Sequence, residues 1–149
     1  MDDKTQKIRY VDLDGTLAYY TGWRGSLFIG DPIPEMLQKV KNWISDGDEV
    51  IIYTARMGPP SQYVPEEQRE AAKKAIEVWC QKHIGQVLPV TAEKGIFDVV
   101  YDDRACQIVP NTGLSVQECL LRRIKHLKAS GLKDTRILDF VVDFLNGLA

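Results

Sequence analysis

The sequence contains few of the residues that hold zinc or build a disulfide framework. It has two histidines, His83 and His126, and three cysteines, none of which form a Cys-x-x-Cys pair. Since zinc sites use clustered cysteine and histidine ligands, a zinc centre is disfavoured. An odd number of scattered cysteines also argues against a disulfide framework and favours the reduced thiols of a cytoplasmic protein.

Long hydrophobic runs and an excess of basic charge are also missing. No stretch reaches the length of a membrane span, and residues 1–7 lack the apolar core of a signal peptide. With a net charge of −2, the chain has no overall basic field that would indicate nucleic-acid binding. We therefore expect a cytoplasmic protein with no membrane partner. Its 149 residues, 44% of them hydrophobic, fit one globular domain over residues 1–149.

Apolar strands and amphipathic helices alternate along the chain. The predicted strands cover residues 7–13, 49–54, 87–90 and 97–101, with a short fifth at 106–109. The predicted helices cover residues 34–46, 65–85, 115 to about 128, and 134–146. Ser115 and Glu118 form a capping box for the third helix, and the proline at position 89 suits an edge strand. This alternation predicts an α/β fold with a mostly parallel sheet flanked by helices.

Acidic and hydroxyl side chains stand at the ends of three predicted strands. Asp12 and Asp14 follow the first strand, Thr54 ends the second, and Asp102 and Asp103 follow the fourth. The carboxyl ends of parallel strands share one edge, where ligands bind, so we expect these residues to converge. Neighbouring carboxylates raise each other's pKa, and a bound cation or a retained proton offsets that cost. The pattern indicates a carboxylate nucleophile with an acid/base partner.

These residues resemble the motifs of the haloacid dehalogenase superfamily. That family has an Asp-x-Asp-Gly-Thr motif, a Thr or Ser ending the second strand, a lysine, and a paired acid after a later strand. The matching segments here are Asp12 to Thr16, Thr54 to Arg56, Lys94, and Tyr101 to Ala105. The resemblance implies a Rossmann-like three-layer sandwich and a phosphatase that uses Mg²⁺.

The resemblance also implies a role for each acid. Asp12 is expected to attack phosphorus and form an aspartyl-phosphate. Asp14 is expected to protonate the leaving oxygen and then to take a proton from water. The expected ligands of Mg²⁺ are the Asp12 carboxylate, the Asp14 backbone carbonyl and Asp102, with Asp103 acting directly or through a water. Such an oxygen-rich set suits magnesium.

Further residues are expected to contact the substrate. Thr54 and Lys94 are expected to hold phosphoryl oxygens, and Gly15 and Thr16 complete the phosphate-binding loop. Taken alone, Lys94 also fits an ordinary surface cation. Arg56 either contacts the leaving group or pairs with an acid.

Neither interval between the motifs has room for a separate cap domain. Residues 17–48 hold one loop and one helix, and residues 57–93 hold one helix and one short strand. An open site suits a large substrate, or it is closed by a partner subunit in a homo-oligomer. The aromatic loop with Tyr19, Tyr20, Trp23 and Arg24 acts either as a small flap or as packing.

Three functions fit the sequence. The leading one is a Mg²⁺-dependent phosphatase acting on a phosphorylated small molecule. The second is a nucleic-acid end phosphatase similar to the phosphatase half of polynucleotide kinase-phosphatases. Its only candidate track for a nucleic-acid backbone is the basic helix face at 122–128. The third is a noncatalytic phosphate- or metal-binding module.

Overall fold

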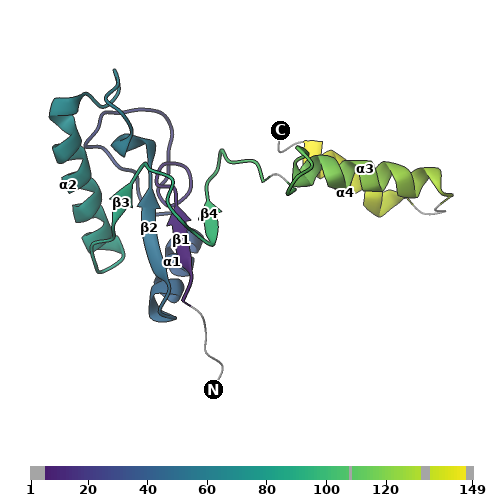
Figure 1. Cartoon of the computed structure of the whole chain (residues 1–149), viewed down its shortest axis with the longest axis horizontal. Helices are drawn as coiled ribbons and strands as arrows, with labels where there is room; N and C mark the ends of the chain where they lie inside the picture. The colour runs from purple at the N-terminus through teal and green to yellow at the C-terminus, as the bar shows by residue number, and fades with distance from the viewer. Residues whose placement is uncertain (1–5, 108, 132–134, 147–149) are drawn as a thin grey trace. The chain divides into compact units, whose positions relative to one another are not determined.

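The chain forms two compact units in a computed structural model that describes residues 6–107, 109–131 and 135–146 (Figure 1). The first unit is Met1–Asp103 and the second is Arg104–Ala149. All named strands belong to the first unit, which also contains every residue of the expected acidic site. A single hydrolase domain over residues 1–149 stays a prediction.

The first unit is built on a parallel sheet. Its strands, in the order β3-β2-β1-β4, are β1 (Ile8–Val11), β2 (Glu49–Tyr53), β3 (Val90–Thr91) and β4 (Val99–Tyr101). This sheet and its helices confirm the predicted α/β class and are consistent with a Rossmann-like three-layer sandwich. The chain runs from β1 to β2 to β3 and then returns to the other side of β1, so strand order reverses between β1 and β4.

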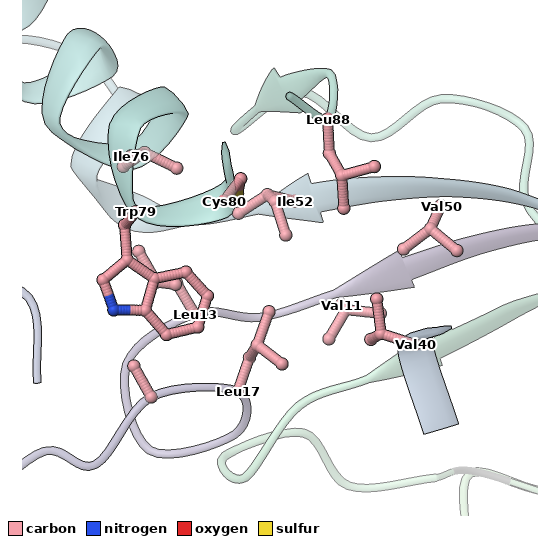
Figure 2. Close-up of a cluster of buried hydrophobic side chains, with 11 residues drawn as sticks. Val11, Leu13, Leu17, Val40, Val50, Ile52, Ile76, Trp79, Cys80 and Leu88 are labelled. Carbon is pink, nitrogen blue, oxygen red and sulfur yellow. The ribbon is translucent and has the colours of Figure 1, made fainter. Parts of the chain in front are cut away.

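Two helices and the sheet share one hydrophobic core. Helix α1 (Pro34–Ser45) connects β1 to β2, and α2 (Glu66–His83) precedes β3. Val11 and Ile52 pair in register on neighbouring strands, and both side chains are fully buried. Figure 2 shows them in one cluster with Val50 of β2 and with residues from both helices and the loops, namely Leu13, Leu17, Val40, Ile76, Trp79, Cys80 and Leu88. This core holds the carboxyl end of β1, from which the site is built.

The predicted strand at 87–90 is displaced toward the C-terminus. The structure places β3 at Val90–Thr91, and the backbone N–H of Ile52 donates to the carbonyl of Pro89 at 2.8 Å. Because proline has no N–H to donate, Pro89 can only accept a bond from β2. The predicted edge position of this segment is confirmed. In the possible strand at 106–109, residue 108 lies outside the described residues and the other three are not in a strand.

The second unit contains α3 (Val116–Ala129) and α4 (Arg136–Asn146). The predicted capping box is confirmed, since Ser115 and Glu118 each accept from the other's backbone N–H. An ion pair between Lys128 and Asp139 joins the two helices. Residue 134, the predicted start of the last helix, lies outside the described residues. None of the helices in the described part of the chain has the length and hydropathy of a membrane span.

Candidate functional site

The register of the sheet brings two acidic residues together. Val11 of β1 pairs with Tyr101 of β4, and the next residues along the two strands are Asp12 and Asp102. The N–H of Asp12 donates to the carbonyl of Tyr101 at 2.8 Å, which continues the pairing by one residue. Carboxylate oxygens of Asp12, Asp102 and Asp103 lie within 4.8 Å of one another. The predicted convergence of these acids is thus present, at the point where strand order reverses.

The loop after β1 fits tightly against the acidic group. Thr16 donates its hydroxyl to Asp12 Oδ2 at 3.3 Å and accepts the backbone N–H of Asp103 at 3.0 Å. Gly15 has a φ of +94°, and a Cβ at this position would lie 2.5 Å from Asp103 Oδ2. Only glycine combines that conformation with so close an approach. Gly15 and Thr16 therefore help to position the carboxylates of Asp12 and Asp103.

The charge of Asp12 is unfavourable in this place. Burial raises the pKa of its carboxyl to about 7, and the negative charge of Asp102 acts in the same direction. A hydrogen bond from the backbone of Leu13 has the opposite, lowering effect on this pKa. Smaller contributions that raise the pKa come from Asp103 and Asp14. A divalent cation bound among the carboxylates would remove this cost, and Asp12, Asp102 and Asp103 are the residues that could hold it.

Asp14 faces a different partner, the guanidinium of Arg56. Arg56 donates Nε–H to Asp14 Oδ2 at 2.6 Å and Nη2–H to Asp14 Oδ1 at 2.8 Å. Such a bidentate pair is strong and fixes the carboxylate plane. Of the two roles considered for Arg56, pairing with an acid is the one present here. A proton on Asp14 would remove the negative charge on which this ion pair depends, so acid/base work at Asp14 would weaken its hold on Arg56.

The aromatic loop, residues 19–31, is held by hydrogen bonds at its base (Tyr19, Gly30 and Asp31) and at its tip (residues 23–28). Tyr19 donates its N–H to the carbonyl of Asp31 at 2.8 Å, and Trp79 of α2 donates Nε1–H to the carbonyl of Gly30 at 2.8 Å. Near the tip, Arg56 donates to the carbonyls of Ser26 at 2.9 Å and Phe28 at 2.8 Å. Residues 19–31 thus form a closed loop whose tip is held by the residue that holds Asp14.

The remaining predicted residues differ in how far the structure supports them. Thr54 is buried directly after β2, and its hydroxyl accepts the N–H of Arg56 at 3.3 Å, capping the short 3-10 helix η1 (Ala55–Met57). This contact positions Arg56. Lys94 is exposed and makes no hydrogen bond or ion pair with the residues that the structure describes. Its phosphoryl-binding role stays a prediction.

Several contacts in this region were not predicted from the sequence. The carbonyls of Ser26 and Phe28 hold Arg56, and Ser26 also donates its hydroxyl to Gln68 of α2 at 2.8 Å. Trp23 lies against Arg56, with 4.9 Å between guanidinium carbon and ring centroid, and meets Tyr63 edge-on. Every residue has a backbone carbonyl, so contacts to carbonyls cannot be predicted from residue types. Only the aromatic residues of the loop could be recognised in the sequence.

Comparison with known proteins adds little to this geometry. No protein-family model and no curated protein matches the chain. Among solved structures it is similar to the conserved protein coded by locus from Bacteroides thetaiotaomicron, with 21% sequence identity and a TM-score of 0.47. That match covers 71% of this chain and 83% of the other. A likeness of this degree does not indicate a function for this chain.

Proposed function

We propose that this protein is a Mg²⁺-dependent phosphatase that hydrolyses a phosphomonoester through an aspartyl-phosphate on Asp12. One observation carries the proposal: carboxylate oxygens of Asp12, Asp102 and Asp103 lie within 4.8 Å at the ends of two adjacent parallel strands. The resemblance of the four sequence motifs to the haloacid dehalogenase superfamily points to the same chemistry.

The donor set fits magnesium. Three carboxylates provide hard oxygen ligands, and the raised pKa of Asp12 reflects a charge that lacks sufficient compensation. Magnesium is commonly bound by one or two carboxylates together with waters and substrate phosphate. Such an ion would supply positive charge beside Asp12 and a coordination position for a phosphoryl oxygen.

The chain's own residues then divide the reaction between them. The hydroxyl of Thr16 holds Asp12 Oδ2 and thereby orients the carboxylate for attack. An oxygen of Asp12 bonds to phosphorus while the bond from phosphorus to the leaving oxygen breaks. The leaving oxygen takes a proton from Asp14. Water next attacks phosphorus, gives a proton to Asp14, and releases inorganic phosphate together with the free Asp12 carboxylate.

A noncatalytic phosphate- or metal-binding module is the second candidate. It is favoured by the bidentate ion pair that occupies both oxygens of Asp14, and by the exposure of Lys94. In this alternative the acidic group binds a cation, but Asp14 never leaves Arg56. The two candidates therefore differ in turnover and share metal binding.

The decisive experiment measures both properties. Phosphate release is followed with Mg²⁺ on phosphorylated sugars, nucleotides and oligonucleotide ends, and Mg²⁺ affinity is measured by calorimetry. A phosphatase predicts turnover that EDTA abolishes, Mg²⁺ restores and Asp12→Asn removes. The matched control is Asp48→Asn, which alters a carboxylate paired with Arg9 away from the site and should retain turnover. Mg²⁺ binding without turnover on any substrate would favour the noncatalytic module, and turnover in Asp12→Asn would contradict the nucleophile.

A further inference from the structure

The side chain of Arg56 binds both the carboxylate of Asp14 and the aromatic loop. This side chain is only 4% exposed. Two N–H groups bind the carboxylate of Asp14, and two others bind the carbonyls of Ser26 and Phe28 in the aromatic loop. Since a guanidinium has no acceptor and only one more N–H, nearly all of its binding capacity is already used within the protein. A direct contact with substrate would require one of these bonds to break.

The loop depends on this side chain for its tip. The base of the loop is held by backbone bonds and by Trp79, independently of Arg56. The tip is held by the two carbonyl contacts, by the hydroxyl of Ser26 on Gln68, and by the ring of Trp23 against the guanidinium. A guanidinium that shifts to follow Asp14 therefore disturbs the tip and leaves the base in place.

We infer that Arg56 is a positioning residue that couples the carboxylate of Asp14 to the tip of the loop over residues 23–28. Movement of Asp14 away from Arg56 and loosening of the loop are then one linked event. Coupling of this kind is reciprocal, so a change in the loop also alters how firmly Asp14 is held. Its consequence for catalysis rests on the proposed function, because only a phosphatase needs Asp14 to give up and take back a proton beside Arg56.

The physical basis is the cost of an uncompensated buried cation. Removing the charge of Asp14 leaves the buried Arg56 guanidinium without its bidentate counter-ion. The guanidinium then has reason to move toward another acid or toward solvent. Either movement lengthens its bonds to the loop carbonyls.

The first test measures loop motion without any substrate. Backbone hydrogen exchange of residues 19–31 is followed by mass spectrometry in Asp14→Asn, Arg56→Met and the double variant. Coupling predicts that each single variant speeds exchange near residues 23–28 by about tenfold and that the double variant is no faster than the faster single one. Unchanged exchange in Asp14→Asn, or multiplied effects in the double variant, would overturn the inference.

The chain offers a closely matched control. Arg9 donates Nε–H to Asp48 Oδ2 at 2.7 Å, and its guanidinium lies 4.6 Å from the ring centroid of Trp43. Arg9→Met and Asp48→Asn thus break another part-buried arginine–aspartate ion pair, at another place in the first unit. Both should leave exchange of residues 19–31 unchanged. Faster loop exchange in these controls would show that the loop responds to general destabilisation, which would contradict the coupling.

Arg56→Lys keeps the positive charge and provides a second test if the Arg56→Met variant does not fold. Lysine offers a point charge and cannot bridge both carboxylate oxygens and two carbonyls together. Loop exchange in Arg56→Lys is therefore expected between that of the wild type and that of Asp14→Asn. Wild-type exchange in this variant would mean that charge alone holds the loop and that bidentate coupling is wrong.

Kinetics provide a second readout that a purely structural role would not move. A positioning role predicts that Arg56→Lys lowers kcat about tenfold or more with KM nearly unchanged. A raised KM with unchanged kcat would identify Arg56 as a substrate ligand and overturn the inference. If the wild type has no turnover and the exchange results still hold, the proposed function fails while the coupling stands.

Discussion

At the scale of single residues, Asp12 has the clearest electrostatic consequence. Burial, reinforced by Asp102, raises the pKa of its carboxyl from 3.8 to about 7. A carboxyl with a raised pKa in the folded protein holds its proton more tightly there than in the unfolded chain. Between these two values, the free energy of unfolding of the metal-free protein therefore falls as the pH rises.

Replacing Asp12 by asparagine should remove this pH dependence. In EDTA at pH 7.5, we expect Asp12→Asn to unfold at a temperature about 5 °C higher than the wild type, a gain on the order of 1 kcal/mol. At pH 4, where Asp12 is mostly protonated in the folded protein, the two should unfold at similar temperatures. Thermal unfolding followed by circular dichroism checks this. An equal difference at both pH values would contradict the assigned cause.

Gly15 tests the close approach of the loop to the acidic group. Gly15→Ala adds a Cβ 2.5 Å from Asp103 Oδ2 and also strains a φ of +94°. We expect Mg²⁺ affinity, measured by calorimetry, to fall about tenfold because Asp103 has to move.

Gly47→Ala is the matched control for this substitution. Its φ is +89°, but an added Cβ meets nothing within 4 Å, so only the backbone strain is shared. Mg²⁺ affinity in Gly47→Ala should equal that of the wild type. An equal loss in both variants would show that strain, and not the contact with Asp103, weakens the site.

The pairing of individual side chains was the hardest part of the site to predict. The positions of Asp12, Asp102 and Asp103 could be predicted, because these residues follow the ends of parallel strands, which share one edge of the sheet. The partner of Asp14 does not, because a long arginine side chain reaches many directions from one backbone position. The Lys94 side chain has the same freedom, and it makes no hydrogen bond or ion pair with the described residues.

At the scale of elements, the sheet edge was predictable because polar residues end strands whose interiors are apolar. Parallel strands put their carboxyl ends on one edge, whatever the detailed register. The boundaries of β3 were less predictable, since Pro89 cannot donate a hydrogen bond and pairing begins one residue later. The closed loop over residues 19–31 was expected only as a flap or as packing. Most of the hydrogen bonds that hold this loop are accepted by backbone carbonyls, which every residue possesses, so the sequence does not indicate them.

Ser26→Ala tests how the loop is held on α2. The variant loses the hydroxyl bond to Gln68 but keeps the carbonyl that accepts from Arg56. We expect a loss of about 1 kcal/mol in loop stability, seen as roughly fivefold faster hydrogen exchange near Ser26. Mg²⁺ affinity should not change, because Asp12, Asp102 and Asp103 are untouched. A loss of Mg²⁺ affinity would mean that the loop, rather than the acids alone, shapes the metal site.

At the scale of the whole molecule, metal binding and folding should be linked. The charge of Asp12 is unfavourable when the site is metal-free, and a cation that binds only the folded state stabilises that state. We expect saturating Mg²⁺ at pH 7.5 to raise the free energy of unfolding by about 2–3 kcal/mol, near the value for a concentration on the order of 100 times Kd. Differential scanning calorimetry measures this, with Na⁺ at equal ionic strength as the control for screening.

This stabilisation should itself depend on pH and on Asp102. At pH 5 the proton on Asp12 competes with the cation, because the pKa of that carboxyl is about 7 in the metal-free protein. The effect of Mg²⁺ on unfolding should therefore be smaller at pH 5 than at pH 7.5. Asp102→Asn should lose most of it at both pH values, since one of the three converging carboxylates is gone. If Mg²⁺ stabilised this variant as much as the wild type, the ion would be binding elsewhere, and the acidic edge of the sheet would not be the metal site.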